Sequence, residues 1–237
     1  MIKLGVLGAG GRMGRSIIEL ALNDSEFDLT LALEKRGHPL SGKYIDKIKI
    51  SSTADGIFLI DVAIDFSLPQ ATFENLDYVL KYKKPLVLGT TGFSEEEADK
   101  IKEAAKAIPI VFSPNMSIGV NLLFGLAGEI ARKLGPGYDI EIVEAHHKAK
   151  KDAPSGTAKK MAQVIANESG RNVTVHALRA GDIVGDHTVI YAGGGERIEL
   201  KHQAHSRDVF AIGALRAAKW IVGKPAGLYS MQDVLKG

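Results

Sequence analysis

A glycine-rich loop near the start of the chain constrains its fold more than any other feature. It reads Gly8-Ala9-Gly10-Gly11-Arg12-Met13-Gly14, between an apolar run at 2–7 and an amphipathic stretch at 12–22. Glycines at such a strand–helix junction allow a tight turn, and they let backbone N–H groups and the helix N-terminus approach a pyrophosphate. We therefore expect a strand, a phosphate-binding loop and a helix in this order, with a dinucleotide bound at the loop.

Strands and helices are expected to alternate through the rest of the first half. Helices begin near Pro69 and at Ser94, where Ser94 and Glu97 have the pattern of a capping box. Apolar runs predict strands at 29–33, 61–66, 85–89 and 108–112. This alternation favours an α/β fold with a doubly wound parallel sheet that is covered on both faces.

The pattern changes after Asn115. Helices are expected at 118–134 and 155–168, and strands at 138–144, 173–177, 186–191 and 197–202. These elements predict an inserted α+β domain with an open mixed sheet that needs a partner surface. A last helix at 206–222 is expected to pack back onto the first domain. The expected domains are 1–117 with 208–237, and 118–207.

Composition excludes several classes of protein. Lys and Arg number 30 against 28 Asp and Glu, a balance that does not fit a protein dedicated to nucleic-acid binding. No apolar run approaches the roughly 18 residues of a membrane span, and the N-terminus has no signal-peptide pattern. The chain has no cysteine, which excludes disulfides, thiolate metal sites and a cysteine nucleophile. We expect a cytoplasmic protein.

Glu34 ends the second expected strand, 20 residues after Gly14. A carboxylate at this place accepts hydrogen bonds from an adenosine ribose. Lys35 follows it and can pair with a 2′-phosphate, so NADH and NADPH both stay open as cofactors. A solvated loop charge is the alternative interpretation of Lys35.

Two further loops follow strands on the edge of the sheet where α/β proteins bind ligands. We expect them to line the nicotinamide pocket, although each one alone is also compatible with a simple turn. They contain Gly89, Thr90 and Thr91 in the first loop, and Ser113, Pro114, Asn115 and Met116 in the second.

The densest group of reactive side chains lies between Glu144 and Ala158. It holds two adjacent histidines, several lysines and a helix start: His146, His147, Lys150, Ser155, Gly156 and Thr157. Free N–H groups at the helix start, with Lys150 nearby, predict a site for a small dicarboxylate. A neighbouring histidine is a candidate proton donor at neutral pH. Structural histidines and solvated lysines are the alternatives. No metal is expected, since no third ligand of suitable spacing follows.

At these residues the chain resembles the 4-hydroxy-tetrahydrodipicolinate (dihydrodipicolinate) reductases of lysine biosynthesis. Residues 144–158 resemble that family's signature, E-x-H-H-x-x-K-x-D-A-P-S-G-T-A. The resemblance continues at 8–15, Glu34, 89–93, 115–121, 179–185 and 231–235.

The resemblance implies a Rossmann domain with an inserted substrate domain, assembled as a homotetramer through the substrate-domain sheets. It implies that NAD(P)H gives a hydride to C4 of (2S,4S)-4-hydroxy-2,3,4,5-tetrahydrodipicolinate, with tetrahydrodipicolinate and water as products. His146 resembles the proton donor and Lys150 a second acid. The residues that resemble the family's binding site for the substrate carboxylates are His147, Gly156 and Thr157. The residues that resemble its cofactor contacts lie at 8–13, 34–35, 89–91 and 113–116.

Two other functions stay open at this point. One is another two-domain NAD(P) amino-acid dehydrogenase, such as an aspartate or homoserine dehydrogenase. The other is a non-catalytic NAD(P)H sensor that signals through its exposed sheet. Lys35 and Met116 stand where some family members carry Arg and Phe, and little sequence lies between Lys43 and Asp61. Structural polar contacts are the favoured interpretation of four further side chains: Arg179, His202, His205 and Arg207.

Overall fold

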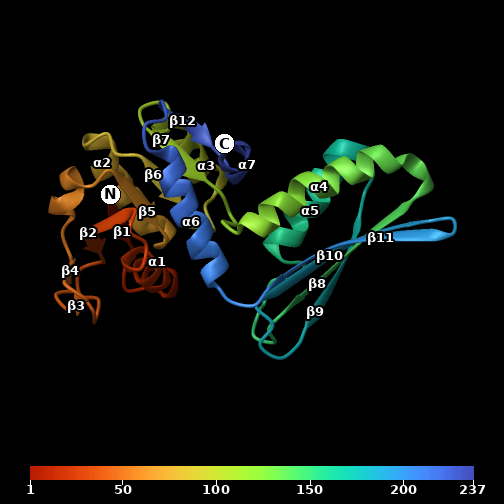
Figure 1. The fold of residues 1–237 in the computed structure, drawn as a ribbon, viewed down its shortest axis with the longest axis horizontal. Coiled ribbons are helices and arrows are strands. Elements are labelled where there is room, and N and C mark those ends of the chain that lie inside the picture. The colour runs from red at the N-terminus through yellow and green to blue at the C-terminus, as the bar shows by residue number, and fades with distance from the viewer. The chain divides into compact units, whose positions relative to one another are not determined.

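The computed structural model describes residues 1–237 (Figure 1). The chain forms two compact units, each with its own sheet. The first unit combines Met1–Ser117 with Phe210–Gly237, and the second is Ile118–Val209. No helix combines the length and apolar content that a membrane span requires.

An eight-stranded sheet forms the centre of the first unit, in the order β12-β7-β6-β5-β1-β2-β4-β3. All neighbouring strands are parallel except β3 and β4. The strands are β1 (Ile2–Leu7), β2 (Phe27–Leu33), β3 (Tyr44–Ile45), β4 (Ile48–Ser51), β5 (Val62–Asp65), β6 (Leu86–Leu88), β7 (Pro109–Phe112) and β12 (Gly227–Tyr229). The expected doubly wound parallel sheet is confirmed, because consecutive parallel strands are joined through helices.

The helices of this unit are α1 (Arg12–Leu22), α2 (Pro69–Lys81), α3 (Glu95–Ala104), α6 (Asp208–Ile221) and α7 (Met231–Lys236), with the 3-10 turn η1 (Ala54–Leu59). Ser94 and Glu97 form the expected capping box at the start of α3. Apolar side chains of α2, α3 and η1 pack with the sheet in one buried cluster that includes Ile57, Leu76 and Ile101. Burial of these side chains away from water stabilises the unit.

Five short elements of this unit were not expected from the sequence: β3, β4, η1, β12 and α7. β3 has two residues and β12 three, too few to show a hydrophobic period. They form because neighbouring strands offer hydrogen-bonding partners: β12 pairs with β7, and β4 pairs with both β2 and β3.

The second unit has a four-stranded mixed sheet in the order β11-β10-β8-β9. Its elements are α4 (Ile118–Leu134), η2 (Gly135–Gly137), β8 (Asp139–His146), α5 (Gly156–Ser169), β9 (Thr174–Arg179), β10 (Gly185–Gly193) and β11 (Glu196–Ala204). Helices α4 and α5 cover one face of this sheet, and the other face carries no helix (Figure 1). Val143 and Leu178 are exposed there, at 37% and 50%. The expected open mixed sheet is confirmed.

Candidate active site

The glycine-rich loop of the first unit makes the expected tight turn between β1 and α1. Gly8 has a φ of +78°, which glycine adopts without strain. A Cβ on Gly14 would lie 2.2 Å from the carbonyl oxygen of Gly8. The close approach of loop and helix therefore requires a residue without a side chain at position 14.

Glu34 lies directly against this loop. Its Oε2 accepts a hydrogen bond from the N–H of Gly10 at 2.8 Å, and its Oε1 accepts one from the N–H of Lys35 at 2.9 Å. Glu34 also lines a cavity of about 570 Å³ together with Gly8, Gly11 and Lys35. This volume is typical of small-molecule sites. The glycine cradle and the carboxylate beside it fit the phosphates and a ribose of a dinucleotide.

Sequence reasoning missed much of the remaining lining of the cavity. These residues come from the segments after β4 and β5 and from α2, and they include Ser52, Thr53, Phe66, Ser67, Asn75 and Tyr78. Phe66 is the last residue of the strand expected at 61–66, and Ser67 follows it, which was the available signal. Ser52 and Thr53 follow β4, which was itself not expected.

The loop after β6 is part of a buried polar network. Thr90 is 3% exposed, and its hydroxyl lies 3.1 Å from that of Thr72. Asp65 is fully buried and accepts hydrogen bonds from the N–H of Ser67 and the amide of Asn75. Burial raises the pKa of the Asp65 carboxyl. The Thr90 side chain is therefore directed into the protein, and Gly89 and Thr90 do not line the cavity.

The loop after β7 also makes mostly local contacts. The Ser113 hydroxyl donates to the carbonyl of Asn115 at 2.7 Å, and Met116 is 1% exposed. Gly213 of α6 packs against the Met116 carbonyl, so closely that a Cβ there would lie 1.8 Å from it. Ser113 and Met116 are buried and Pro114 is exposed, so the side chains of Ser113 and Met116 are not available to a ligand.

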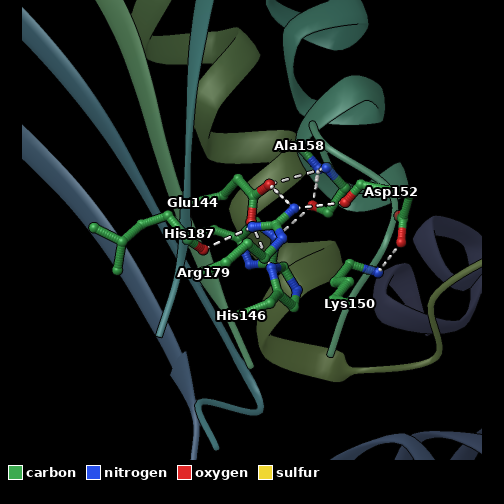
Figure 2. Close-up of polar contacts among 9 residues, drawn as sticks. Glu144, His146, Lys150, Asp152, Ala158, Arg179 and His187 are labelled. Carbon is green, nitrogen blue, oxygen red and sulfur yellow. Dashed lines mark hydrogen bonds and ion pairs between the residues drawn. The ribbon is translucent and has the colours of Figure 1, made fainter. Parts of the chain in front are cut away.

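A buried ion cluster holds the candidate proton donor of the second unit (Figure 2). Glu144 and His146 lie two residues apart on β8, so their side chains share the helix-covered face of the sheet. Oε2 of Glu144 lies 2.5 Å from Nδ1 of His146. Arg179, from β9, donates to both carboxylate oxygens, with Nη1–Oε2 at 2.9 Å and Nη2–Oε1 at 2.8 Å.

For Glu144 and His146 alike, burial shifts the pKa in one direction and the oppositely charged neighbour shifts it in the other. Burial alone raises the pKa of Glu144, but hydrogen bonds from Arg179, His146 and the Ser155 N–H outweigh it and hold that pKa below its ordinary value. Burial lowers the pKa of His146, with smaller contributions from Lys150 and Arg179, and Glu144 offsets part of this. Both effects follow from removing charged groups from water.

Ser155 has a different role from the expected one. Its N–H donates to Oε1 of Glu144 at 3.0 Å, and its hydroxyl accepts from the N–H of Ala158 as the cap of α5. The expectation of a free N–H group at Ser155 is therefore wrong, because a residue 11 positions earlier binds it. Gly156 and Thr157 form the first turn of α5, and the space where a Gly156 Cβ would lie is open.

Lys150 is held close to this helix start by an ion pair. Its Nζ lies 2.8 Å from Oδ1 of Asp152, whose backbone carbonyl accepts a hydrogen bond from Arg179 at 2.6 Å. His147 follows the end of β8 and is half-buried. The structure thus brings His146, Lys150 and Ser155 into one contact network and places His147, Gly156 and Thr157 beside it in the chain.

Sequence reasoning assigned no role to three members of this network: Glu144, Arg179 and His187. His187 of β10 packs edge-on against His146, with ring centroids 5.2 Å apart, and its Nε2 lies 3.3 Å from the Ser155 hydroxyl. The polar contact expected for Arg179 is confirmed. No group of three or more His, Cys, Asp or Glu side chains converges on a point that could hold a metal ion.

Comparison with known proteins covers both units. The family described as "Dihydrodipicolinate reductase, N-terminus" matches residues 2–116, and "Dihydrodipicolinate reductase, C-terminus" matches residues 119–235. The chain belongs to the dihydrodipicolinate reductase family. A 4-hydroxy-tetrahydrodipicolinate reductase of Syntrophus aciditrophicus is 46% identical, with 99% of this chain and 98% of the relative covered. The corresponding protein of Geotalea daltonii is 44% identical, with 99% of both chains covered.

Solved structures agree on the fold. A dipicolinate-bound dihydrodipicolinate reductase from Paenisporosarcina sp. TG-14 has a TM-score of 0.84 at 24% identity and covers 97% of both chains. Aspartate dehydrogenase from Thermotoga maritima has a TM-score of 0.55 at 12% identity, with 95% of this chain and 98% of that chain covered. Folds of this type therefore occur in several oxidoreductases, and the family is decided by the sequence matches.

Proposed function

We propose that this protein is the NAD(P)H-dependent reductase that converts 4-hydroxy-tetrahydrodipicolinate to tetrahydrodipicolinate and water in lysine biosynthesis, by way of diaminopimelate. One observation carries the proposal within the family. The carboxylate of Glu144 binds His146 through one oxygen and the start of α5 through the other, at 2.5 and 3.0 Å. A candidate acid and a candidate anion site are thereby joined by one buried group.

The reaction sets the tasks of the two units. When bound, NAD(P)H supplies the hydride that joins C4 of the heterocycle. The 4-hydroxyl leaves as water, so that one hydride and one proton are added in all for each water lost. Hydride addition at C4 of the dehydrated ring leaves an enamine, and His146 donates the proton that this enamine takes up at the ring carbon next to C4. Lys150 serves as a second acid and as a cation for a substrate carboxylate.

We assign cofactor binding to the first unit. The backbone of residues 8–13 holds the pyrophosphate, Glu34 accepts from the adenosine ribose, and Lys35 pairs with a 2′-phosphate when one is present. The loops at 89–91 and 113–116 contribute backbone groups on the nicotinamide side. The support is the cavity at Gly8, Gly11, Glu34 and Lys35. The buried side chains of Thr90 and Met116 agree with backbone contacts at these loops.

We assign the substrate to the second unit. Two carboxylates need cations and N–H donors, which His147, Lys150, Gly156 and Thr157 provide at the start of α5. Ser155 supports the site by capping the helix and by its contact with Glu144, since its own N–H is already bound. The dipicolinate bound to the Paenisporosarcina reductase is a planar dicarboxylate of this kind.

We further propose a cytoplasmic homotetramer with no nucleic-acid partner. The face of the second sheet without a helix exposes Val143 and Leu178, and apolar side chains on an uncovered sheet are stabilised by a partner surface. A second copy of the chain offers that surface with the same chemistry.

The first experiment is an absorbance assay of NADH and NADPH oxidation, with substrate made in place from pyruvate and aspartate semialdehyde by the synthase. Oxidation that depends on the synthase supports the proposal. Oxidation of aspartate with NAD⁺ would support an amino-acid dehydrogenase instead. Binding of NADH without any turnover would support a sensor and overturn the proposal.

A further inference from the structure

Glu144 is a fully buried carboxylate whose two oxygens both have partners from other elements. Oε1 accepts from the Ser155 N–H and from Arg179, and Oε2 contacts Arg179 and His146. The side chain is 0% exposed. The proposed chemistry gives Glu144 no contact with the substrate or the cofactor, so the effect of its carboxylate on His146 needs a separate explanation.

The guanidinium of Arg179 keeps Glu144 ionised. Two charge-assisted hydrogen bonds in bidentate geometry, together with the Ser155 N–H, stabilise the charged form. An ionised carboxylate only accepts hydrogen bonds. The Nδ1 atom of His146, 2.5 Å away, must therefore carry a proton whether the ring is neutral or cationic.

We infer that Glu144 is a positioning residue of the proposed reductase reaction, which keeps one proton fixed on Nδ1 of His146 so that only Nε2 gains and releases the transferable proton. This inference rests on the proposed function. Nε2 is the nitrogen on the far side of the ring, and it lies 3.1 Å from the place where a Cβ on Gly185 would be. The missing side chain at Gly185 leaves room at that atom.

The groups around His146 make the effect testable because they act in opposite directions. Glu144 on β8 favours the protonated ring, whereas Lys150 in the following loop and Arg179 on β9 disfavour it. His187 on β10 packs against the ring, and Asp152 pairs with Lys150. Removing the Glu144 charge must lower the pKa of His146 further, and removing the Arg179 charge must raise it.

The direct test is a ¹⁵N NMR titration of the imidazole nitrogens in the full-length protein. The signal of His146, one of 7 histidines, is assigned by its loss in His146→Gln. In the wild type we expect Nδ1 to stay protonated and Nε2 to titrate. Glu144→Gln should mix the tautomers and lower the pKa, and Arg179→Met should raise it. General loosening of the cluster would not give opposite shifts.

Kinetics provide the second readout. Because the acid form of His146 is required, kcat should fall with rising pH, and in Glu144→Gln this fall should occur at lower pH. At pH 7.5 we expect kcat to drop about 10²-fold, with the KM for NADH unchanged and partial recovery as the pH is lowered. Glu144→Asp keeps the charge and should retain part of the activity. Glu144→Asp also replaces Glu144→Gln as the test variant if Glu144→Gln does not fold.

Two results would overturn the inference. One is a wild-type His146 that is neutral with its proton on Nε2. The other is a folded Glu144→Gln protein with an unchanged pH profile of kcat. Failure of the reductase proposal is a separate outcome, since wild-type protein would then oxidise no cofactor while the NMR titration still reports the tautomer.

Discussion

The carboxylate of Asp152 lies 2.8 Å from the ammonium group of Lys150, two residues before it. Asp152 is therefore paired with the same ammonium group that we propose binds a carboxylate of the substrate. The pair is partly exposed, with the Asp152 side chain at 54%, so water and salt weaken it. A bound dianion must compete with Asp152 for Lys150.

Asp152→Asn should therefore strengthen dicarboxylate binding. We expect the Kd for dipicolinate to fall about 2- to 5-fold, the size typical of exposed ion pairs. Isothermal titration calorimetry at low ionic strength measures this Kd, and Asp139→Asn, at the first residue of β8, is the control. A weaker Kd in Asp152→Asn would mean that Asp152 orients Lys150 for the ligand and does not compete with it.

His146→Gln should slow turnover by about 10²–10⁴-fold while leaving the affinity for NADH unchanged. The reason is that glutamine keeps a polar side chain at the site but cannot donate the proton. Steady-state kinetics and NADH fluorescence titration measure the two effects. His176→Gln, on the exposed edge strand β9 with Glu141 as its partner, should leave both unchanged. An unaltered kcat in His146→Gln removes this residue from the acid role.

Lys35→Gln should raise the KM for NADPH about 3- to 10-fold with little change for NADH, because only NADPH carries a 2′-phosphate. Lys35 lines the cavity beside Glu34, so its charge acts at the ribose. The ratio of kcat/KM for the two cofactors is the measurement, with the exposed Lys47→Gln as the control. Equal losses for both cofactors would show that Lys35 contacts a feature they share.

The sequence predicted elements best where apolar spacing was long and regular. Helices α1 and α4 begin and end at the expected residues, and nine of the strands were expected within two residues of their bounds. Short strands were missed because their hydrogen bonds come from neighbours: β3 and β12 have no period of their own. Such tertiary partners are not encoded in local pattern.

The candidate site shows the same division. The helix start at Gly156 and the histidine pair were found from local sequence. Glu144 could have been found too, because residues two positions apart on a strand, such as Glu144 and His146, have their side chains on the same face. Arg179 could not, since its place depends on the parallel pairing of β8 with β9, which sets His146 opposite Arg179. The N–H of Ser155 was expected to be free because the first N–H groups of a helix have no acceptor within the helix itself. Its acceptor, Glu144, lies on β8 and cannot be found from the residues next to Ser155.

Gly185→Ala should impair catalysis more than folding. The added Cβ would lie 3.1 Å from Nε2 of His146 and 3.8 Å from Cε1 of His187, so the His146 ring must shift or its proton-donating atom be crowded. We expect kcat to fall about 10-fold or more, because a misplacement of about 1 Å at a reacting group can cost about 10²-fold in rate. Gly194→Ala, in the β10–β11 hairpin with open space around it, should be close to wild type. Equal kcat for both variants would show that the ring adapts.

His187 should make the protein less stable in acid. Burial lowers its pKa from 6.5 to about 4, so the unfolded chain binds a proton at higher pH than the folded one. Its neutral form is therefore compatible with full stability above pH 6.5, and stability is lost as the pH falls from 6.5 towards 4.

The expected loss is at most about 3 kcal/mol, since one pKa unit corresponds to about 1.36 kcal/mol. Urea unfolding of wild type and His187→Gln at pH 7.5 and 4.5 measures it. We expect the variant to be less stable at both pH values, because the contact with the Ser155 hydroxyl changes, but its free energy of unfolding should fall less between them. If both proteins lose the same free energy over this range, another group controls the acid sensitivity of the second unit.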